Sequence, residues 1–522
     1  MCGIVGYIGY REAFPILIKG LKRLEYRGYD SAGVALLNGH LQIHKKQGKV
    51  SALEESISEE PMKTTVGIGH TRWATHGEPN DENAHPHFSD SKDYAIIHNG
   101  IIENYGSLKK ELEKKGYKFR SDTDTEVLVT FIEDIVKEYD CSLEEGVRIA
   151  LSKVVGAYAI VVMSAKDETK LVAARKGSPL VIGVGQGEYF LASDATPIIE
   201  YTNEVVYLND EEVAVLSRDG LEIKDFEALT QTPYIHTLDL ALESIEKSGY
   251  EHFMLKEIFE QPNSIADCMR GRLKAAEGHL VLGGIRDYAN ALVNADKIIF
   301  VACGTSWHSC LVAEYIIEEL CRIPVEVEYA SEFRYRNPII NEGDVVFAVS
   351  QSGETADTLA AMELAKSKGA ILFGIVNVVG SSIARTSHEG AYLHAGPEIG
   401  VASTKAFTAQ LVVLTMIALK MAYLRGTIAE RRFHELLVDL ERIPQKVAEV
   451  LKQAKKVEEI AYLFKDAHNF LYLGRGLNFP VALEGARQCQ FHLCGATAAD
   501  GAPLPHGDPC IVGIGTSDYA SD

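Results

Sequence analysis

The chain is poor in cysteine and has no excess of positive charge. Its 522 residues include 9 cysteines without even spacing, and its formal net charge at pH 7 is -21. Nucleic acid and anionic membranes both require a basic protein surface, so this charge argues against either partner. Scattered cysteines in a chain of this length are typical of reduced thiols, so we expect a cytoplasmic protein.

Long apolar runs are also missing. The most apolar helical stretch, LVVLTMIALKMAYL, is short and is interrupted by Lys420, which favours a buried core helix over a membrane span. The first residues, MCGIVGYIGY, carry no positive charge ahead of an apolar run, so a secretory signal is not expected.

Patterns typical of nucleotide and metal sites are absent as well. No Walker lysine or GxGxxG follows a strand-like segment, and there is neither a Ser-Gly-Gly-Asp loop nor an apolar strand that ends in paired acids. The histidines of the first hundred residues show no closed metal-ligand spacing. They include His70, His76, His85, His87 and His98.

The length predicts two to four domains, and the pattern of the chain changes twice. Up to about residue 225, short apolar runs between turn residues predict a β-rich domain, residues 2–225. Residues 226–285 are charged and amphipathic, which predicts a helical linker. Strand-like and helix-like segments then alternate over residues 286–430, which predicts a parallel sheet with helices on both faces.

The segment KIIFVACGTSWHSCLVAEYII has a strand–turn–helix pattern, and the segment NFLYLGRGLNFPVALEGA repeats it. We therefore expect a second α/β domain over residues 455–522. We expect it to be incomplete and aberrant from about residue 487, because the Gly- and Pro-rich text there has no helix or strand period. A zinc site is an alternative for this segment, although its cysteine spacing fits no structural pair. The cysteines are Cys489, Cys494 and Cys510.

A cysteine directly follows the initiator methionine. In one interpretation Cys2 is an ordinary buried thiol. In the other, removal of the methionine gives a terminal residue that carries both a thiol and a free α-amine. That residue would be a nucleophile with its own base, since the α-amine has a pKa of about 7.7–8.0.

Four further residues supply what amide hydrolysis by a terminal cysteine requires. Asn99 through its side chain and Gly100 through its backbone N–H suit an oxyanion hole. Arg72 can bind the carboxylate of an amino acid with two hydrogen bonds, and Asp124 can pair with its ammonium group.

The segments CGIVGYIG, EYRGYDSAG, HTRWATHGEP, HNGIIEN and DTDTEV resemble the glutaminase domain of the class II glutamine amidotransferases. The resemblance implies a four-layer αββα Ntn-hydrolase fold. It implies that Cys2 is the nucleophile, that Asn99 and Gly100 form the oxyanion hole, and that Arg72 and Asp124 hold glutamine. It also assigns to the glutamine pocket Trp73, Thr75, His76 and Gly77.

Two hydroxyl-rich turns, CGTS (303–306) and SQSGETADT (350–358), follow predicted strands and precede predicted helices. These hydroxyls could simply cap the helices. Two such turns at strand ends of one parallel sheet favour instead a crevice for a small phosphorylated sugar.

With GVASTKAFTAQ, these turns resemble the sugar isomerase (SIS) domain, which implies a flavodoxin-like αβα fold. The implied sugar-phosphate ligands are Thr305, Ser306, Ser350, Gln351, Ser352 and Thr355. Val401 and Ser403 would contact the sugar, and Glu484 matches the first acid of the family's LEGA motif. We interpret Lys405 as structural rather than as a Schiff-base lysine.

The two resemblances in this order imply one reaction. The amide nitrogen of glutamine would pass to fructose 6-phosphate, giving glucosamine 6-phosphate and glutamate, the first step of hexosamine biosynthesis toward UDP-N-acetylglucosamine. The implied enzyme needs no cofactor (no metal, nucleotide or pyridoxal phosphate), passes ammonia internally and is a homodimer.

The end of the chain departs from the family. Phe491 stands where a second glutamate is expected, Gln488 replaces a lysine, and His506 in PHGDP only partly matches a His-Gly-Pro turn. We therefore expect a glutaminase with little synthase activity. The alternative is a catalytically degenerate protein that senses sugar phosphate.

We predict that the mature protein begins at Cys2, because only a free α-amine can act as the base. Intact-mass measurement and end-group sequencing of the purified protein test this. Retained methionine together with full glutamine turnover would overturn the mechanism.

Overall fold

The chain divides into two compact units, Met1–Ile245 and Glu246–Asp522. The computed structural model describes residues 2–25, 30–57, 63–72, 78–237, 246–400, 402–467, 470–496 and 511–513, with side chains up to residue 488. Each unit has its own hydrophobic clusters. The domain ranges inferred from the sequence remain predictions. The described part of the range 226–285 contains four strands of two residues each as well as a helix.

Two antiparallel sheets form the centre of the first unit. The first sheet has the order β15-β11-β9-β10-β1-β4-β2-β3. Its strands are β1 (Gly3–Ile8), β2 (Ser31–Leu37), β3 (Leu41–Gln47), β4 (Val66–Arg72), β9 (Val181–Val184), β10 (Tyr189–Ala192), β11 (Glu204–Tyr207) and β15 (His236–Thr237). The second sheet has the order β14-β13-β12-β8-β7-β6-β5. Its strands are β5 (His87–Phe88), β6 (Tyr94–Ile102), β7 (Gly156–Ser164), β8 (Asp167–Lys176), β12 (Glu212–Ser217), β13 (Gly220–Asp225) and β14 (Thr230–Gln231).

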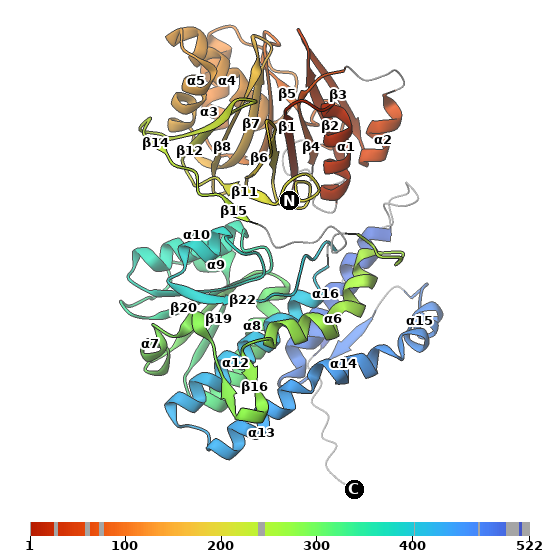
Figure 1. Ribbon diagram of the computed structural model, residues 1–522, viewed down its shortest axis with the longest axis vertical. Helices are drawn as coiled ribbons and strands as arrows, with labels where there is room; N and C mark the ends of the chain where they lie inside the picture. The colour runs from red at the N-terminus through yellow and green to blue at the C-terminus, as the bar shows by residue number, and fades with distance from the viewer. Residues whose placement is uncertain are drawn as a thin grey trace. The chain divides into compact units, whose positions relative to one another are not determined.

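Helices cover the outer face of each sheet (Figure 1). They are α1 (Ala13–Leu24) and α2 (Val50–Ser56) on the first sheet, and α3 (Tyr105–Lys114), α4 (Asp124–Tyr139) and α5 (Leu143–Ser152) on the second. Alternate residues of each strand face opposite layers. Ile97 belongs to the core between the sheets, whereas Ile96 packs with α4. The predicted αββα fold is therefore confirmed.

The second unit contains a parallel sheet with the order β19-β18-β20-β21-β22. Its strands are β18 (Ile298–Ala302), β19 (Val325–Tyr329), β20 (Val345–Ser350), β21 (Ile371–Val376) and β22 (Glu389–Tyr392). In chain order this is 2-1-3-4-5, the flavodoxin-like arrangement, and the strand order reverses between β18 and β20. The predicted flavodoxin-like αβα fold is therefore confirmed.

Both faces of this sheet are covered. On one face lie α6 (Phe253–Met269), α8 (Thr305–Cys321), α12 (Lys405–Arg425) and α13 (Glu430–Glu441). On the other lie α9 (Ala330–Tyr335), α10 (Ala356–Ser367) and α11 (Ser382–Thr386). By length and composition α12 could cross a membrane, but 61% of its most apolar window is buried inside the unit, as the sequence predicted for a core helix.

Short elements complete the unit. Ahead of the sheet lie β16 (Leu273–Lys274), the 3₁₀ turns Ala275–Glu277 and Gly283–Ile285, β17 (His279–Leu280) and α7 (Ala289–Val293). After α13 come α14 (Ile443–Leu451), α15 (Ala454–Leu463), β23 (Leu471–Leu473), α16 (Asn478–Ala496) and β24 (Ile511–Gly513). Strands β23 and β24 pair in parallel, so α16 is the crossover of a βαβ unit, consistent with the repeated strand–turn–helix text.

Three aromatic rings cross the centre of the parallel sheet. Phe347 stacks between Phe300 at 5.1 Å and Phe373 at 4.9 Å, and all three side chains are fully buried. We predict that Phe347→Ala lowers the free energy of unfolding of the second unit by about 3–5 kcal/mol. Urea unfolding tests this, with the half-exposed Phe464 as the control. Phe464→Ala should change stability by less than about 0.5 kcal/mol, and equal effects of the two variants would contradict the packing.

Candidate active site

Cys2 directly precedes β1, which lies between β10 and β4 in the first sheet. The half-buried Cys2 thus sits at the end of an inner strand, whose two ladders hold it in place. Asn99 on β6 of the other sheet donates a hydrogen bond from Nδ2 to the Cys2 carbonyl oxygen at 3.0 Å. The contact joins the predicted nucleophile to a predicted oxyanion donor.

Gly100 follows Asn99 on β6 and has a φ of 138°. A Cβ atom at this position would lie 2.0 Å from the Ala157 carbonyl oxygen, so a larger residue would displace the β7 backbone. Gly100 is also exposed, so its backbone is accessible to a ligand. The sequence HNG therefore lies within a strand in which Gly100 has a positive φ, and it does not form the turn that an Asn-Gly pair often indicates.

Arg72 and Asp124 are buried at the ends of their elements. Arg72 is the last residue of β4, and Asp124 is the first residue of α4. Burial lowers the pKa of Arg72, while the nearby charges of Cys2, Asp30 and Asp124 partly oppose this shift. These charge interactions show that the structure gathers Cys2, Arg72 and Asp124 in one region.

The segment SDTDTE begins α4, as its capping pattern predicts. Thr123 is the N-cap, and its hydroxyl accepts a hydrogen bond from the Glu126 backbone N–H. Asp124 accepts a hydrogen bond from the Ile102 N–H at 2.8 Å, which ties the start of α4 to the end of β6. This anchoring gives the Asp124 carboxylate a defined position.

Buried histidines connect these residues, and sequence reasoning had considered them only as metal ligands. His70 Nε2 lies 2.9 Å from Asn99 Oδ1. Thr125, next to Asp124, contacts His85 Nε2 at 3.0 Å and His98 Nδ1 at 2.9 Å. No potential metal-binding group is found among the residues that the structure describes. The sequence carried no signal for these contacts, because they join segments that are distant in the chain: two strands of different sheets in one case and helix α4 in the other two.

Several predicted site residues lie outside the described residues. They are Trp73, Thr75, His76, Gly77 and Val401. His506 lies outside them too, and Phe491 belongs to α16 without a described side chain. The same holds for the side chains of Cys489, Cys494 and Cys510.

In the second unit the two hydroxyl-rich turns lie on neighbouring strands. CGTS follows β18 and SQSGET follows β20, on either side of the reversal in strand order. The N-cap of α8 is Gly304 and that of α10 is Thr355, and neither helix has a side-chain capping hydrogen bond. The hydroxyls therefore do not serve as ordinary caps, and these helix N-termini remain suited to an anion.

The hydroxyl groups are held by one another and by buried amides. Ser350 contacts the Thr355 hydroxyl at 2.9 Å and accepts a hydrogen bond from the Gly353 N–H at 3.0 Å. Ser306 accepts one from Gln410 Nε2 at 2.9 Å. Gln410 lies on α12 and was not singled out in the sequence.

Ser352 and Gln351 complete the second turn. The Ser352 hydroxyl accepts a hydrogen bond from the Glu354 N–H at 3.2 Å, and the Gln351 carbonyl accepts one from the Asn377 N–H at 3.1 Å. The turn after β20 is thus anchored at several points.

Glu484 reaches the first turn from α16. Its carboxylate accepts hydrogen bonds from Thr305 Oγ1 at 2.8 Å and from His308 Nδ1 at 2.5 Å. Gln488 Nε2 also donates to Glu484. Glu484 is therefore hydrogen-bonded to the turn CGTS, which is predicted to bind the sugar phosphate. His308 is a further polar neighbour of Glu484, and the sequence analysis did not identify it.

The loop that carries Ser403 is held by two buried glutamates. Glu398 accepts hydrogen bonds from the Ser403 hydroxyl at 2.7 Å and the Thr404 N–H at 2.8 Å. Glu257 of α6 accepts one from the Gly400 N–H at 3.0 Å. Lys405 pairs with Glu260 at 2.7 Å, which supports the interpretation of this lysine as structural.

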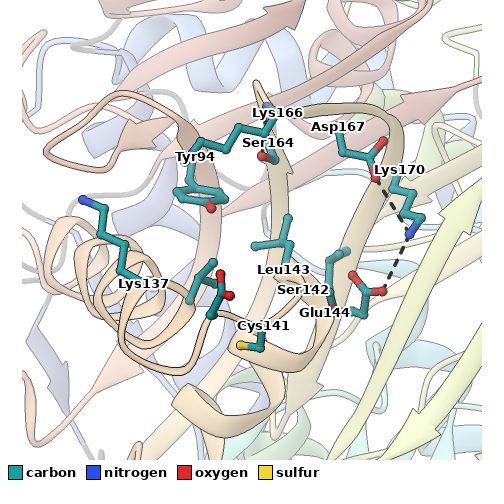
Figure 2. A pocket seen from close by; sticks show the side chains of 13 residues that line it. Tyr94, Lys137, Cys141, Ser142, Leu143, Glu144, Ser164, Lys166, Asp167 and Lys170 are labelled. Atoms are coloured by element: carbon teal, nitrogen blue, oxygen red, sulfur yellow. Dashed lines mark hydrogen bonds and ion pairs between the residues drawn. The ribbon is translucent and has the colours of Figure 1, made fainter.

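A cavity of about 380 Å³ also lies in the first unit (Figure 2). Lys170 lies 3.6 Å from Glu144 and 3.8 Å from Asp167, and Lys166 pairs with Asp93 at 2.9 Å. None of the predicted glutaminase residues lines the cavity. The lysines that line the cavity are all paired with acids, so none of them marks it as an anion site.

Residues 55–251 match the model of the glutamine amidotransferase domain, and residues 291–420 match that of the SIS domain. The fold and the gathered residues define the chain as a glutamine amidotransferase joined to a sugar isomerase domain.

Curated relatives narrow this class to one family. The isomerizing glutamine–fructose-6-phosphate aminotransferase of Bacteroides thetaiotaomicron is 56% identical over 520 residues, 98% of this chain and 84% of the relative. The enzyme of the same name from Chlorobaculum tepidum is 57% identical over 520 residues, again 98% of this chain and 84% of the relative. The chain belongs to the isomerizing glutamine–fructose-6-phosphate aminotransferase family. Among solved structures, the C-terminal domain of glucosamine-fructose-6-phosphate aminotransferase from Francisella tularensis aligns with a TM-score of 0.44 and 38% identity, over 46% of this chain and 67% of that one.

The buried Glu257 predicts how the stability of the second unit depends on pH. Burial raises the pKa of Glu257 to about 7, above the usual value of about 4.3. The stabilisation from holding this proton is complete below about pH 4 and is lost as the pH rises through 7. The free energy of unfolding should therefore fall between pH 5 and 8, by on the order of 2–3 kcal/mol.

Glu257→Gln should flatten this dependence, since the amide stays neutral and can still accept the Gly400 N–H. Thermal unfolding of the second unit at several pH values measures the effect. The exposed Glu319 of α8 provides the control, and Glu319→Gln should keep the wild-type slope. An unchanged slope in Glu257→Gln would contradict the assignment.

Proposed function

We propose that the chain uses glutamine as the nitrogen donor for fructose 6-phosphate, giving glucosamine 6-phosphate and glutamate at the start of hexosamine biosynthesis. The observation that carries this proposal is the contact between Cys2 and Asn99 beside the buried Arg72 and Asp124. Membership of the aminotransferase family supports the choice of both substrates.

In the first step the Cys2 thiol adds to the carboxamide carbon of glutamine while the α-amine of Cys2 takes the thiol proton. The carbonyl oxygen becomes an oxyanion, which Asn99 Nδ2 and the Gly100 N–H stabilise. The C–N bond then breaks, and the α-ammonium returns the proton to the leaving nitrogen as ammonia. Water, activated by the same amine, hydrolyses the thioester to glutamate and restores the thiol.

Recognition of glutamine needs two opposite charges. Arg72 would bind the α-carboxylate and Asp124 the α-ammonium group, so that only a free amino acid fits. Both side chains are nearly fully buried, with 4% and 6% of their surface exposed, and their attraction to the substrate charges is therefore weakly screened by water.

The phosphate of the sugar would bind between the turns after β18 and β20. Thr305 and Ser306 at the start of α8, and Ser350, Ser352 and Thr355 ahead of α10, offer hydroxyls beside two helix N-termini. These neutral donors suit a phosphate monoester, and the reversal in strand order is where such sheets bind ligands. Gln351 would join these hydroxyls at the phosphate, and Val401, Ser403 and Glu484 would line the sugar.

We expect this chain to catalyse the isomerisation of the sugar only slowly. Gln488, which stands in place of the family's lysine, donates a hydrogen bond to Glu484 but cannot supply a charged ammonium group. Loss of a general acid or base typically lowers a rate by about 10²–10⁴-fold. We further propose a cytoplasmic homodimer, which the composition and the family resemblance favour.

We predict that the protein releases glutamate from glutamine and forms glucosamine 6-phosphate at a much lower rate. Glutamate and glucosamine 6-phosphate should be measured separately, with and without fructose 6-phosphate. Cys2→Ala should abolish glutamate release, because no other group in the proposed mechanism can form the thioester.

Cys141 provides the matched control, since it is also a half-buried cysteine of the first unit and contacts none of the proposed residues. Cys141→Ala should keep the wild-type rate. Glutamate release by Cys2→Ala at the wild-type rate would refute the mechanism. Failure of the wild-type protein to form either product would favour the sugar-phosphate sensor instead.

A further inference from the structure

The side-chain amide of Asn99 has two orientations of nearly equal shape. Only one of them points the NH₂ group toward Cys2, while the other would present a carbonyl oxygen, which repels an oxyanion. In the structure Nδ2 faces the Cys2 carbonyl oxygen at 3.0 Å and Oδ1 faces His70 Nε2 at 2.9 Å. The residue opposite Oδ1 therefore decides which orientation is stable.

His70 can act only as a donor at this position. Its Nε2 atom faces two acceptors, Asn99 Oδ1 at 2.9 Å and the His98 carbonyl oxygen at 3.1 Å. Its Nδ1 atom is buried and has no hydrogen-bond partner in the described part of the chain. Burial lowers the pKa of His70 to about 3, so the ring is neutral near pH 7. His70 is thus the neutral tautomer with its proton on Nε2.

This tautomer disfavours the rotated amide. A rotated Asn99 would direct its NH₂ group against the Nε2–H of His70. The His98 carbonyl oxygen would still accept from Nε2–H, but the NH₂ group of Asn99 would face a donor in place of an acceptor. An unsatisfied buried polar group costs about 1–3 kcal/mol. The observed orientation satisfies both partners and leaves the NH₂ group directed at Cys2.

His70 is itself held from two sides. On β4 it lies opposite Ile4 of β1 and Gly33 of β2, so both of its neighbouring strands fix its backbone. Its ring stacks on that of His85 at 4.2 Å. His85 in turn contacts the Thr125 hydroxyl at 3.0 Å, one residue after Asp124. A buried network therefore connects the oxyanion donor to the start of α4.

We propose that His70 is a positioning residue of the glutaminase reaction, which holds the Asn99 amide with its NH₂ group toward the oxyanion. The inference rests on the proposed function, because the role of Asn99 belongs to it. In this proposal His70 acts on the reaction through Asn99.

His70→Leu removes the donor and keeps an apolar side chain of similar size. Loss of a whole oxyanion donor lowers kcat by about 10²–10³-fold, so we expect a fall of roughly tenfold to hundredfold. The KM for glutamine should stay unchanged, because Arg72 and Asp124 keep their positions. His70→Gln should recover most of the activity, since its amide can place an N–H near the position of Nε2.

A double-mutant cycle with Asn99→Ala separates positioning from a general structural role. If His70 acts through Asn99, the double variant His70→Leu/Asn99→Ala should be no slower than Asn99→Ala alone. The rate at which iodoacetamide alkylates Cys2 should be the same in all variants. The half-buried His44 of β3 provides the control, and His44→Leu should keep the wild-type kcat.

Full kcat in His70→Leu, multiplicative losses in the double variant, or slowed alkylation of Cys2 would each overturn the inference. If His70→Leu does not fold, nitrogen-15 NMR of the wild-type protein carries the test. His70 should hold its proton on Nε2 and stay neutral between about pH 5 and 9. A proton on Nδ1, or a titration in this range, would overturn the inference. Absence of glutamate release from the wild-type protein would instead refute the proposed function, whatever the tautomer.

Discussion

The first unit depends on a contact between its two sheets at the start of the chain. Cys2 leads into an inner strand of one sheet, and Asn99 on β6 of the other sheet reaches it with a hydrogen bond. Cys2 could not hold this position alone, because residues near the start of a chain fray unless they are tied into a sheet. The ladders of β1 with β4 and β10 provide that anchor for the segment that follows Cys2.

The same region buries several polar and charged groups. Arg72, Asp124 and the imidazoles of His70, His85 and His98 all lie inside. Such groups are costly unless each finds a partner, and the network through Thr125 and Asn99 provides several of them. These hydrogen bonds fix the orientation of the buried polar side chains. The network holds the Asn99 amide against Cys2 and keeps the buried charges of Arg72 and Asp124 in the same region.

The second unit solves a related problem with a different geometry. Its hydroxyl-rich turns are separated in the chain by β19, yet they meet because β18 and β20 pair directly. Gln410 of α12 and Glu484 of α16 contact the turn after β18, although both residues are far from it in the sequence. In both units, side chains from distant segments complete a site whose backbone frame comes from inner strands. In the second unit the polar residues lie in turns after apolar strands, whereas in the first unit Asn99 and Arg72 belong to the strands themselves.

Composition, periodicity and local motifs determined much of this protein. The β-rich first part, the alternating second part, the core helix α12 and the N-cap of α4 all depend on interactions within a few residues, so the sequence predicted them. Cys2, Arg72, Asn99 and Asp124 could also be named, because their chemical types suit amide hydrolysis in a known family. Only the tertiary structure decided that His70 faces Asn99, that Gln410 holds Ser306 and that His308 meets Glu484. The first contact depends on strand register, since a shift of one residue would turn His70 or Asn99 to the opposite face of its sheet. The other two depend on how α12 and α16 pack against α8.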